Sequence, residues 1–199
     1  SASGVLPNPV GYNRVYVYVR PGFTYEKWWD GLRAGRCFVS NGPLLRARAN
    51  GQWPGEVFRS VDGKPVEIDL DAMLSGRDPV PALEVVRDGK VVRSIPVPAN
   101  GTRASLGKLT FNESGWFLVR AISSEANTFR FASTGPFYVE AGANKSRISK
   151  ASARFFLDWV KEGMARVRAP EGERKEAVLQ FHRAGEKFWT DKVASANSE

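Results

Sequence analysis

Four Asn-Gly or Asp-Gly pairs divide the middle of the chain into short segments. They are Asn50-Gly51, Asp62-Gly63, Asp88-Gly89 and Asn100-Gly101. Both residues of such a pair tolerate the positive φ that a two-residue type I′ hairpin turn requires. In the stretch "LEVVRDGKVVRSIPV" two apolar runs directly flank one of these pairs. The spacing therefore predicts a series of short antiparallel strands.

Alternating apolar and polar residues support the same interpretation. The segment "VEIDLDAML" has an apolar face of Val66, Ile68 and Leu70 and an acidic face of Glu67, Asp69 and Asp71. Strands are also expected in "NRVYVYV", "GWFLVRAIS" and "FRFASTGPFYVEA". Seven or eight strands at this spacing predict a mostly β fold, an antiparallel immunoglobulin-like β-sandwich over residues 1–145. A chain of 199 residues, 42% of them hydrophobic, can bury one sizeable core.

Helical patterns lie on both sides of the expected strands. A short helix at about 24–34 is expected as an insertion in the sandwich, because Thr24 can cap its start and Gly35 can end it. From residue 146 apolar residues recur at helical spacing on both sides of Pro170. We expect residues 146–199 to form a helical hairpin packed on the sandwich, with a frayed tail "ASANSE".

Two similar kinks lie about ninety residues apart, Ser40-Asn41-Gly42-Pro43 and Ser133-Thr134-Gly135-Pro136. In the structural interpretation each kink ends a strand or moves it to another sheet, since Gly permits unusual φ and Pro lacks a donor. In a second interpretation both kinks lie at one end of the sandwich and face a partner domain. Asn41, Ser40, Thr134 and Ser133 would then be interdomain or cleft-rim groups. This requires residues 38–45 and 131–138 to approach within about 5 Å.

Residues for catalysis or metal binding are scarce. The chain has one histidine, His182, and one cysteine, Cys37. Asp69 and Asp71 could hold a hard cation, but a solvated sheet face explains them better. Arg33 and Arg36 could lower the pKa of Cys37, although a buried apolar role is favoured. We therefore expect no catalytic residue, no metal ligand and no cofactor in this chain.

Two further features bear on binding partners. Trp53 lies in a turn between two glycines and is the best candidate for stacking on a ligand such as a sugar ring. The net charge of +8 is divided equally between residues 1–144 and 145–199, which argues against a nucleic-acid partner. No run of about 18 apolar residues exists, so neither a membrane span nor a membrane partner is expected.

Several stretches, in order, resemble a known family. They are "NPVGYNRVYVYV", "TYEKWWDGLRAGRCFVSNGPLL", "LEVVRDGKVV", "SGWFLVRA" and "STGPFYVE". Together they are similar to the C-terminal region of the carbaryl-hydrolase-like (CehA/McbA) metallohydrolases, in the polymerase-and-histidinol-phosphatase (PHP) superfamily. The resemblance covers most of residues 9–165, and its most specific part runs from Trp28 to Leu45. Ala132 departs from it, because the family often has a His-Thr-Ser-Pro-like sequence there.

The resemblance implies a role for the chain. In that family the metal-binding His and Asp residues belong to an upstream catalytic domain, where a divalent metal is expected. This chain would be the non-catalytic accessory domain downstream, and its partner would be the catalytic domain of the same polypeptide. A free-standing carbohydrate- or ligand-binding module and a complete enzyme remain alternatives. The oligomeric state, the compartment and the substrate of the parent hydrolase stay open at this point.

Overall fold

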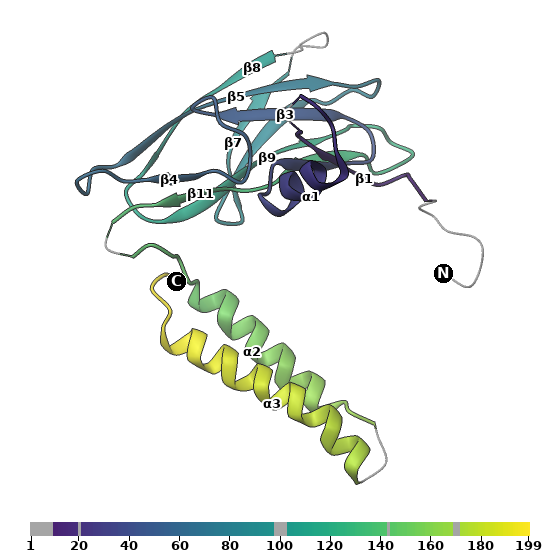
Figure 1. Ribbon diagram of the computed structural model, residues 1–199, viewed down its shortest axis with the longest axis vertical. Helices are drawn as coiled ribbons and strands as arrows, with labels where there is room; N and C mark the ends of the chain where they lie inside the picture. The colour runs from purple at the N-terminus through teal and green to yellow at the C-terminus, as the bar shows by residue number, and fades with distance from the viewer. Residues whose placement is uncertain (1–9, 20, 98–102, 143, 169–171) are drawn as a thin grey trace. The chain divides into compact units, whose positions relative to one another are not determined.

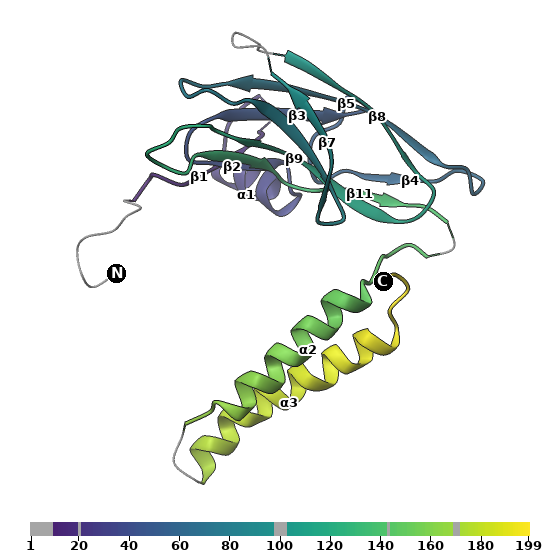
Figure 2. The same ribbon diagram turned by 180° about the vertical axis from the view of Figure 1, so that it is seen from behind.

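The computed structural model describes residues 10–19, 21–97, 103–142, 144–168 and 172–199. The described chain forms eleven strands and three helices, in the order that Figures 1 and 2 show. It separates into two compact units, Ser1–Lys145 and Ser146–Glu199. The boundary coincides with the change from strand patterning to helical patterning in the sequence.

The smaller sheet of the first unit has three antiparallel strands, in the order β3 (Leu44–Ala49), β5 (Val66–Ser75) and β8 (Arg103–Phe111). The alternation expected in β5 is confirmed, since Ile68 and Leu70 are buried while Glu67 and Asp69 are exposed.

The β8 strand is absent from the segments expected from sequence, and an irregular register explains why. Leu70 lies opposite Gly107, and the next residue of β5 lies opposite Ser105. Leu106 is therefore the extra residue of a β-bulge, and it is buried together with Leu109, three residues later. A spacing of three does not fit the two-residue period by which strands are recognised.

The larger sheet has eight strands. Its path runs from β1 (Arg14–Val17) through β2 (Cys37–Ser40), β10 (Phe131–Thr134), β9 (Gly115–Ile122) and β11 (Phe137–Glu140) to β4 (Val57–Arg59). The other edge of β9 pairs with β6 (Ala82–Arg87), which in turn pairs with β7 (Lys90–Pro96). Both β10 and β11 pair with β9, so they are two halves of one interrupted strand.

The core lies between the two sheets. Its fully buried side chains come from both, among them Leu45 and Ile68 of the smaller sheet and Leu83, Phe117 and Phe137 of the larger. The first unit is therefore a β-sandwich, as expected from the sequence. Burial of one such side chain contributes roughly 1.5–3 kcal/mol to stability.

Three of the four expected turns have the φ angles of a type I′ turn. Asn50, Asp62 and Asp88 have φ of +46°, +54° and +49°, and the glycine that follows each is also positive. Asp88-Gly89 joins β6 to β7 directly, because Arg87 pairs with Lys90. Asn100-Gly101 lies outside the described residues.

The first helix, α1 (Tyr25–Arg33), lies beside β1. Thr24 caps its start by accepting a hydrogen bond from the Lys27 N–H at 3.2 Å, and Gly35 follows its end with φ +71°. A Cβ on Gly31 would lie 2.6 Å from the Val17 side chain. The helix therefore packs on β1 closely enough to require glycine at that position.

The second unit is a pair of adjacent helices, α2 (Lys150–Ala165) and α3 (Glu173–Ala194). The rings of Phe156 and Trp189 stack between them with centroids 4.7 Å apart. Four other large aromatic side chains are more than half exposed, namely Phe155, Trp159, Phe181 and Phe188. The packing of this unit on the sandwich stays a prediction.

The end of the chain differs from the expected frayed tail. Asn197 Oδ1 accepts a hydrogen bond from the Ile148 N–H at 2.9 Å, and the Lys150 N–H donates to Ser198 O at 2.8 Å. The last residues return to the start of α2 and pair with it, so the expectation of a frayed tail is wrong.

Candidate functional site

The two kinked segments lie on neighbouring strands. β2 and β10 pair antiparallel, with Ser40 opposite Ala132 and Thr134 opposite Phe38. The expected close approach of residues 38–45 and 131–138 is therefore confirmed.

The kinks themselves lie at opposite ends of this strand pair. Because β2 and β10 run in opposite directions, Gly42 follows the end of β2 next to Arg130, while Gly135 follows the end of β10 next to Cys37. About five residue steps, or roughly 16 Å, separate them along the strands. The hypothesis that both kinks share one end of the sandwich is wrong, and the structural interpretation explains each of them.

The first kink moves the chain from one sheet to the other, since β2 belongs to the larger sheet and β3 to the smaller. Ser40 is 2% exposed, and its hydroxyl donates to Pro43 O and accepts from the Gly42 N–H. The Asn41 side chain accepts from the Phe131 N–H at 2.8 Å and donates to Phe129 O at 2.9 Å. Ser40 thus holds the turn itself, whereas Asn41 ties the turn to the neighbouring segment at the start of β10.

The second kink is a β-bulge. Ser133 lies opposite Arg120 and Phe137 lies opposite Phe117, so three residues on one strand face two on β9. The buried Thr134 accepts a hydrogen bond through Oγ1 from the Val119 N–H at 3.1 Å, which replaces a ladder bond. A Cβ on Gly135 would lie 2.6 Å from Gly35 O, so only glycine fits this approach.

Ser133 lies on the outer face of the larger sheet, unlike Ser40 and Thr134. It is the cross-strand neighbour of Val39, which in turn lies opposite Val15. Val15 and Val39 are 45% and 38% exposed. We call Val15, Val39 and Ser133 the outer stripe.

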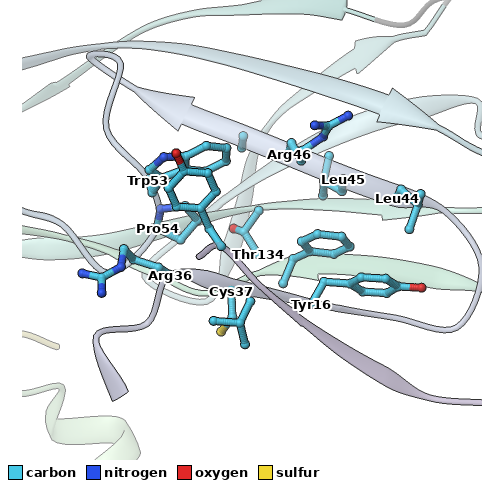
Figure 3. Close-up of a pocket in the computed structure, with 13 residues that line it drawn as sticks. Tyr16, Arg36, Cys37, Leu44, Leu45, Arg46, Trp53, Pro54 and Thr134 are labelled. Carbon is cyan, nitrogen blue, oxygen red and sulfur yellow. The ribbon is translucent and has the colours of Figure 1, made fainter. Parts of the chain in front are cut away.

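A cavity of about 250 Å³ opens between β3 and the end of the larger sheet. Figure 3 shows Tyr16, Cys37 and Thr134 on one side of it and Leu44 and Leu45 on the other. The lining is mostly apolar, and two arginines, Arg36 and Arg46, also contribute to it. No sequence motif indicates this cavity, because its walls come from segments that only the fold brings together.

Trp53 lines this cavity, but both faces of its indole are covered within the chain. The Tyr18 ring stacks on it with centroids 3.9 Å apart, and the Arg48 guanidinium lies 3.8 Å from its centroid. One face cannot hold both groups at these distances, so they lie on opposite faces. A sugar ring would have to displace one of them before it could stack on Trp53.

Cys37 also lines the cavity, and burial raises the pKa of its thiol. The suggested lowering of this pKa by neighbouring arginines is therefore wrong, because loss of hydration of the thiolate dominates.

His182 lies on α3, where its Nδ1 is 3.1 Å from Val178 O.

Among the residues that the structure describes, no three His, Cys, Asp or Glu side chains come close enough to share a metal ion. Asp71 instead forms an ion pair on the exposed face of the smaller sheet, with its Oδ1 3.5 Å from Nη2 of Arg103.

Within the same described residues, no helix is long and apolar enough to span a membrane.

Comparisons with known proteins gave few matches. No family model matches the chain, and no curated protein matches it. Among solved structures, the chain is similar to the fibronectin(III)-like modules of Clostridium thermocellum CbhA, with 21% sequence identity and a TM-score of 0.30. The match covers 47% of this chain and 93% of the matched chain.

Proposed function

We propose that this chain is the non-catalytic, immunoglobulin-like accessory domain of a PHP-type metal-dependent hydrolase. It packs on the catalytic domain that precedes it in the same polypeptide and shapes that domain's surface. The divalent metal and the catalytic residues belong to the catalytic domain.

The strand order supports the immunoglobulin-like assignment. The sheet β3–β5–β8 faces a second sheet whose successive strands include β7, β6, β9 and the interrupted strand β10–β11. Immunoglobulin-like sandwiches likewise pair strands A, B and E in one sheet and strands C′, C, F and G in the other. The chain adds β1, β2 and β4 beyond the last of these strands.

One observation carries the proposal. The segments that resemble the metallohydrolases are far apart in the sequence, yet nearly all of them form the larger sheet or the helix beside it. They supply residues of β1, α1, β2, β6, β7, β9, β10 and β11, whereas none of the quoted stretches lies in β5 or β8. Residues of such a surface can act together in binding one partner.

The outer stripe supports a docking role for this surface. Val15 and Val39 are exposed cross-strand neighbours. Phe23, just before the neighbouring helix α1, and Tyr25, its first residue, are 73% and 66% exposed. Clustered exposed apolar side chains mark surfaces that other domains cover.

The proposal is tested on the complete polypeptide encoded by the gene. We expect an upstream region with an Asp-x-His-x-His-like cluster. In that polypeptide Val39→Glu places a charge in the domain contact and lowers the melting temperature, whereas in the 199-residue chain it has little effect. Met73→Glu, on the 37%-exposed Met73 of β5 in the smaller sheet, is the matched control. Equal effects of both variants in the long polypeptide, or an upstream region without metal ligands, would contradict the proposal.

A further inference from the structure

The free edge of β3 carries backbone groups without partners. The Asn50 N–H donates to Asp69 O on β5, and N–H directions alternate along a strand. The N–H and C=O groups of Leu45 and Ala47 therefore point away from β5. Neither residue forms a hydrogen bond on that side with any residue that the structure describes.

Pro54 explains why this edge is open. After the turn at Asn50-Gly51, Gln52 forms a hydrogen-bonded pair with Ala49, so the next hydrogen-bonded pair of the hairpin would be Pro54 with Ala47. Proline has no N–H to donate to Ala47 O. The chain leaves β3 there, and the Gly55 N–H donates to Pro136 O in the other sheet.

The cavity lies where the next strand of the smaller sheet would run. Four consecutive residues of β3, Leu44 to Ala47, line the cavity. Successive side chains of a strand point to opposite faces of the sheet, so a cavity on one face would be lined by alternate residues only. The cavity therefore faces the edge of β3. The larger sheet continues past β10 to β2 and β1, while the smaller sheet ends at β3. The stacked rings of Tyr16 and Phe38 therefore line the cavity without a strand above them.

The backbone groups of Leu45 and Ala47 are buried, so bulk water does not satisfy them as it would at an exposed strand edge. Leu45 and Ala47 are 0% and 1% exposed. Native proteins pair nearly all buried backbone polar groups, so a ligand that supplies hydrogen bonds here is favoured. Its entry requires movement of the side chains over the cavity, such as Tyr18 and Trp53, which lie beyond strand ends.

The charges at the rim indicate what such a ligand carries. Arg36 and Arg46 line the cavity, and Figure 3 shows both guanidinium groups turned outward. Neither forms an ion pair with a residue in the described ranges. A strand beside β3 would place alternate side chains on the outward face next to Arg46, where carboxylates fit.

We propose that the free edge of β3 binds an extended peptide strand in which apolar residues alternate with acidic ones. The backbone of the peptide pairs with Leu45 and Ala47, one apolar side chain fills the cavity, and the acidic side chains lie beside Arg46. This strand addition completes the smaller sheet over Tyr16 and Phe38. The inference is independent of the accessory-domain proposal.

The test uses the complete 199-residue chain labelled with nitrogen-15. The probe is an acetylated, amidated nine-residue peptide in which four Glu residues alternate with Val and a central Phe. We expect shifts and slowed exchange at the Leu45 and Ala47 amides. Two methylated peptides are compared, one with the backbone nitrogens of the apolar residues methylated and one with those of the Glu residues methylated. Alternate N–H groups of a strand point to the same edge, and only one edge of the peptide faces β3. Methylation should therefore abolish binding in one of the two peptides only. Equal tolerance or equal loss for the two sets would overturn the proposal.

Charge provides the matched control. Arg46→Glu should weaken binding of the acidic peptide about fivefold and strengthen binding of the version with Lys in place of Glu. Lys90→Glu, on the far strand β7, should change neither affinity. Three results would each contradict an acidic peptide strand as the occupant. The first is no binding at 1 mM peptide, and the second is self-association of the chain through β3. The third is a small apolar molecule that occupies the cavity without contacting the Leu45 and Ala47 amides.

Discussion

Thr134 accepts a hydrogen bond through its side-chain oxygen from the backbone N–H of Val119, at 3.1 Å. The hydroxyl occupies the place of a backbone carbonyl at the bulge between β10 and β11. The Ser-Thr-Gly-Pro sequence therefore supplies the turn glycine, the strand break and the replacement acceptor together. This local function accounts for the second kink without a partner domain.

Replacing Thr134 should expose this role. Thr134→Val keeps the shape but leaves the buried Val119 N–H without an acceptor, which costs about 1–3 kcal/mol. Thr134→Ser keeps the oxygen and loses one methyl group. Hydrogen exchange at the Val119 amide should accelerate in the Val variant and stay slow in the Ser variant. Equal protection in both would show that the hydroxyl does not replace the ladder bond.

The hairpin turn at Asp88 gives a second prediction. Asp88 has φ +49°, its N–H donates to Trp116 O, and its carboxylate accepts from the Trp116 N–H at 3.1 Å. Asp88→Asn keeps all three features, whereas Asp88→Pro fixes φ near −65° and removes the donor. We expect a loss of about 3 kcal/mol or more for Pro and under about 1 kcal/mol for Asn, measured by urea unfolding. Equal midpoints would contradict the type I′ assignment.

The thiol of Cys37 should react slowly. Burial raises its pKa above the ordinary value of 9.0, so less thiolate exists at any given pH. We expect iodoacetamide to modify the folded chain more slowly than the urea-unfolded chain at pH 8. The pKa of the thiol is higher in the folded chain than in the unfolded chain. The contribution of Cys37 to the free energy of unfolding is therefore fully present below pH 9.0 and is lost as the pH rises through the folded pKa. Faster alkylation of the folded chain would indicate an activated thiolate.

The helical hairpin gives a prediction about the whole chain. Phe155, Trp159, Phe181 and Phe188 are each more than half exposed on the hairpin. We expect the sandwich to cover them, each contributing roughly 1.5–3 kcal/mol when fully buried. A chain ending at residue 145 should therefore aggregate or melt at a markedly lower temperature. A soluble truncated chain with an unchanged melting temperature would show that the units do not pack.

Features encoded by neighbouring residues could be predicted from the sequence. The Asp88-Gly89 turn follows from two adjacent residues, and the faces of β5 follow from its alternation. The bulge at Leu106 hid β8, because an extra residue shifts the two-residue period. The regular turn and the regular alternation are thus visible in the local sequence, whereas the bulge removed the period by which β8 would be recognised.

The candidate site depends on pairings that the local sequence does not specify. Ser40 and Thr134 carry similar motifs, yet the antiparallel register of β2 and β10 places the two kinks at opposite ends. The open edge of β3 arises because Pro54 falls opposite Ala47 after a two-residue turn. The positions of the kinks and the open edge of β3 both follow from the register of strand pairing. This register relates residues far apart along the chain or on two sides of a turn, so the local sequence does not reveal it.

The accessory-domain proposal is tested most directly by metal content and hydrolysis, measured in parallel on the 199-residue chain and on the complete polypeptide of its gene. Elemental analysis after ordinary purification should find a divalent transition metal in the complete polypeptide, which should hydrolyse ester or phosphodiester substrates. The 199-residue chain should contain no stoichiometric metal and show no such activity. About one zinc, manganese or iron ion per 199-residue chain, accompanied by hydrolysis, would contradict the proposal.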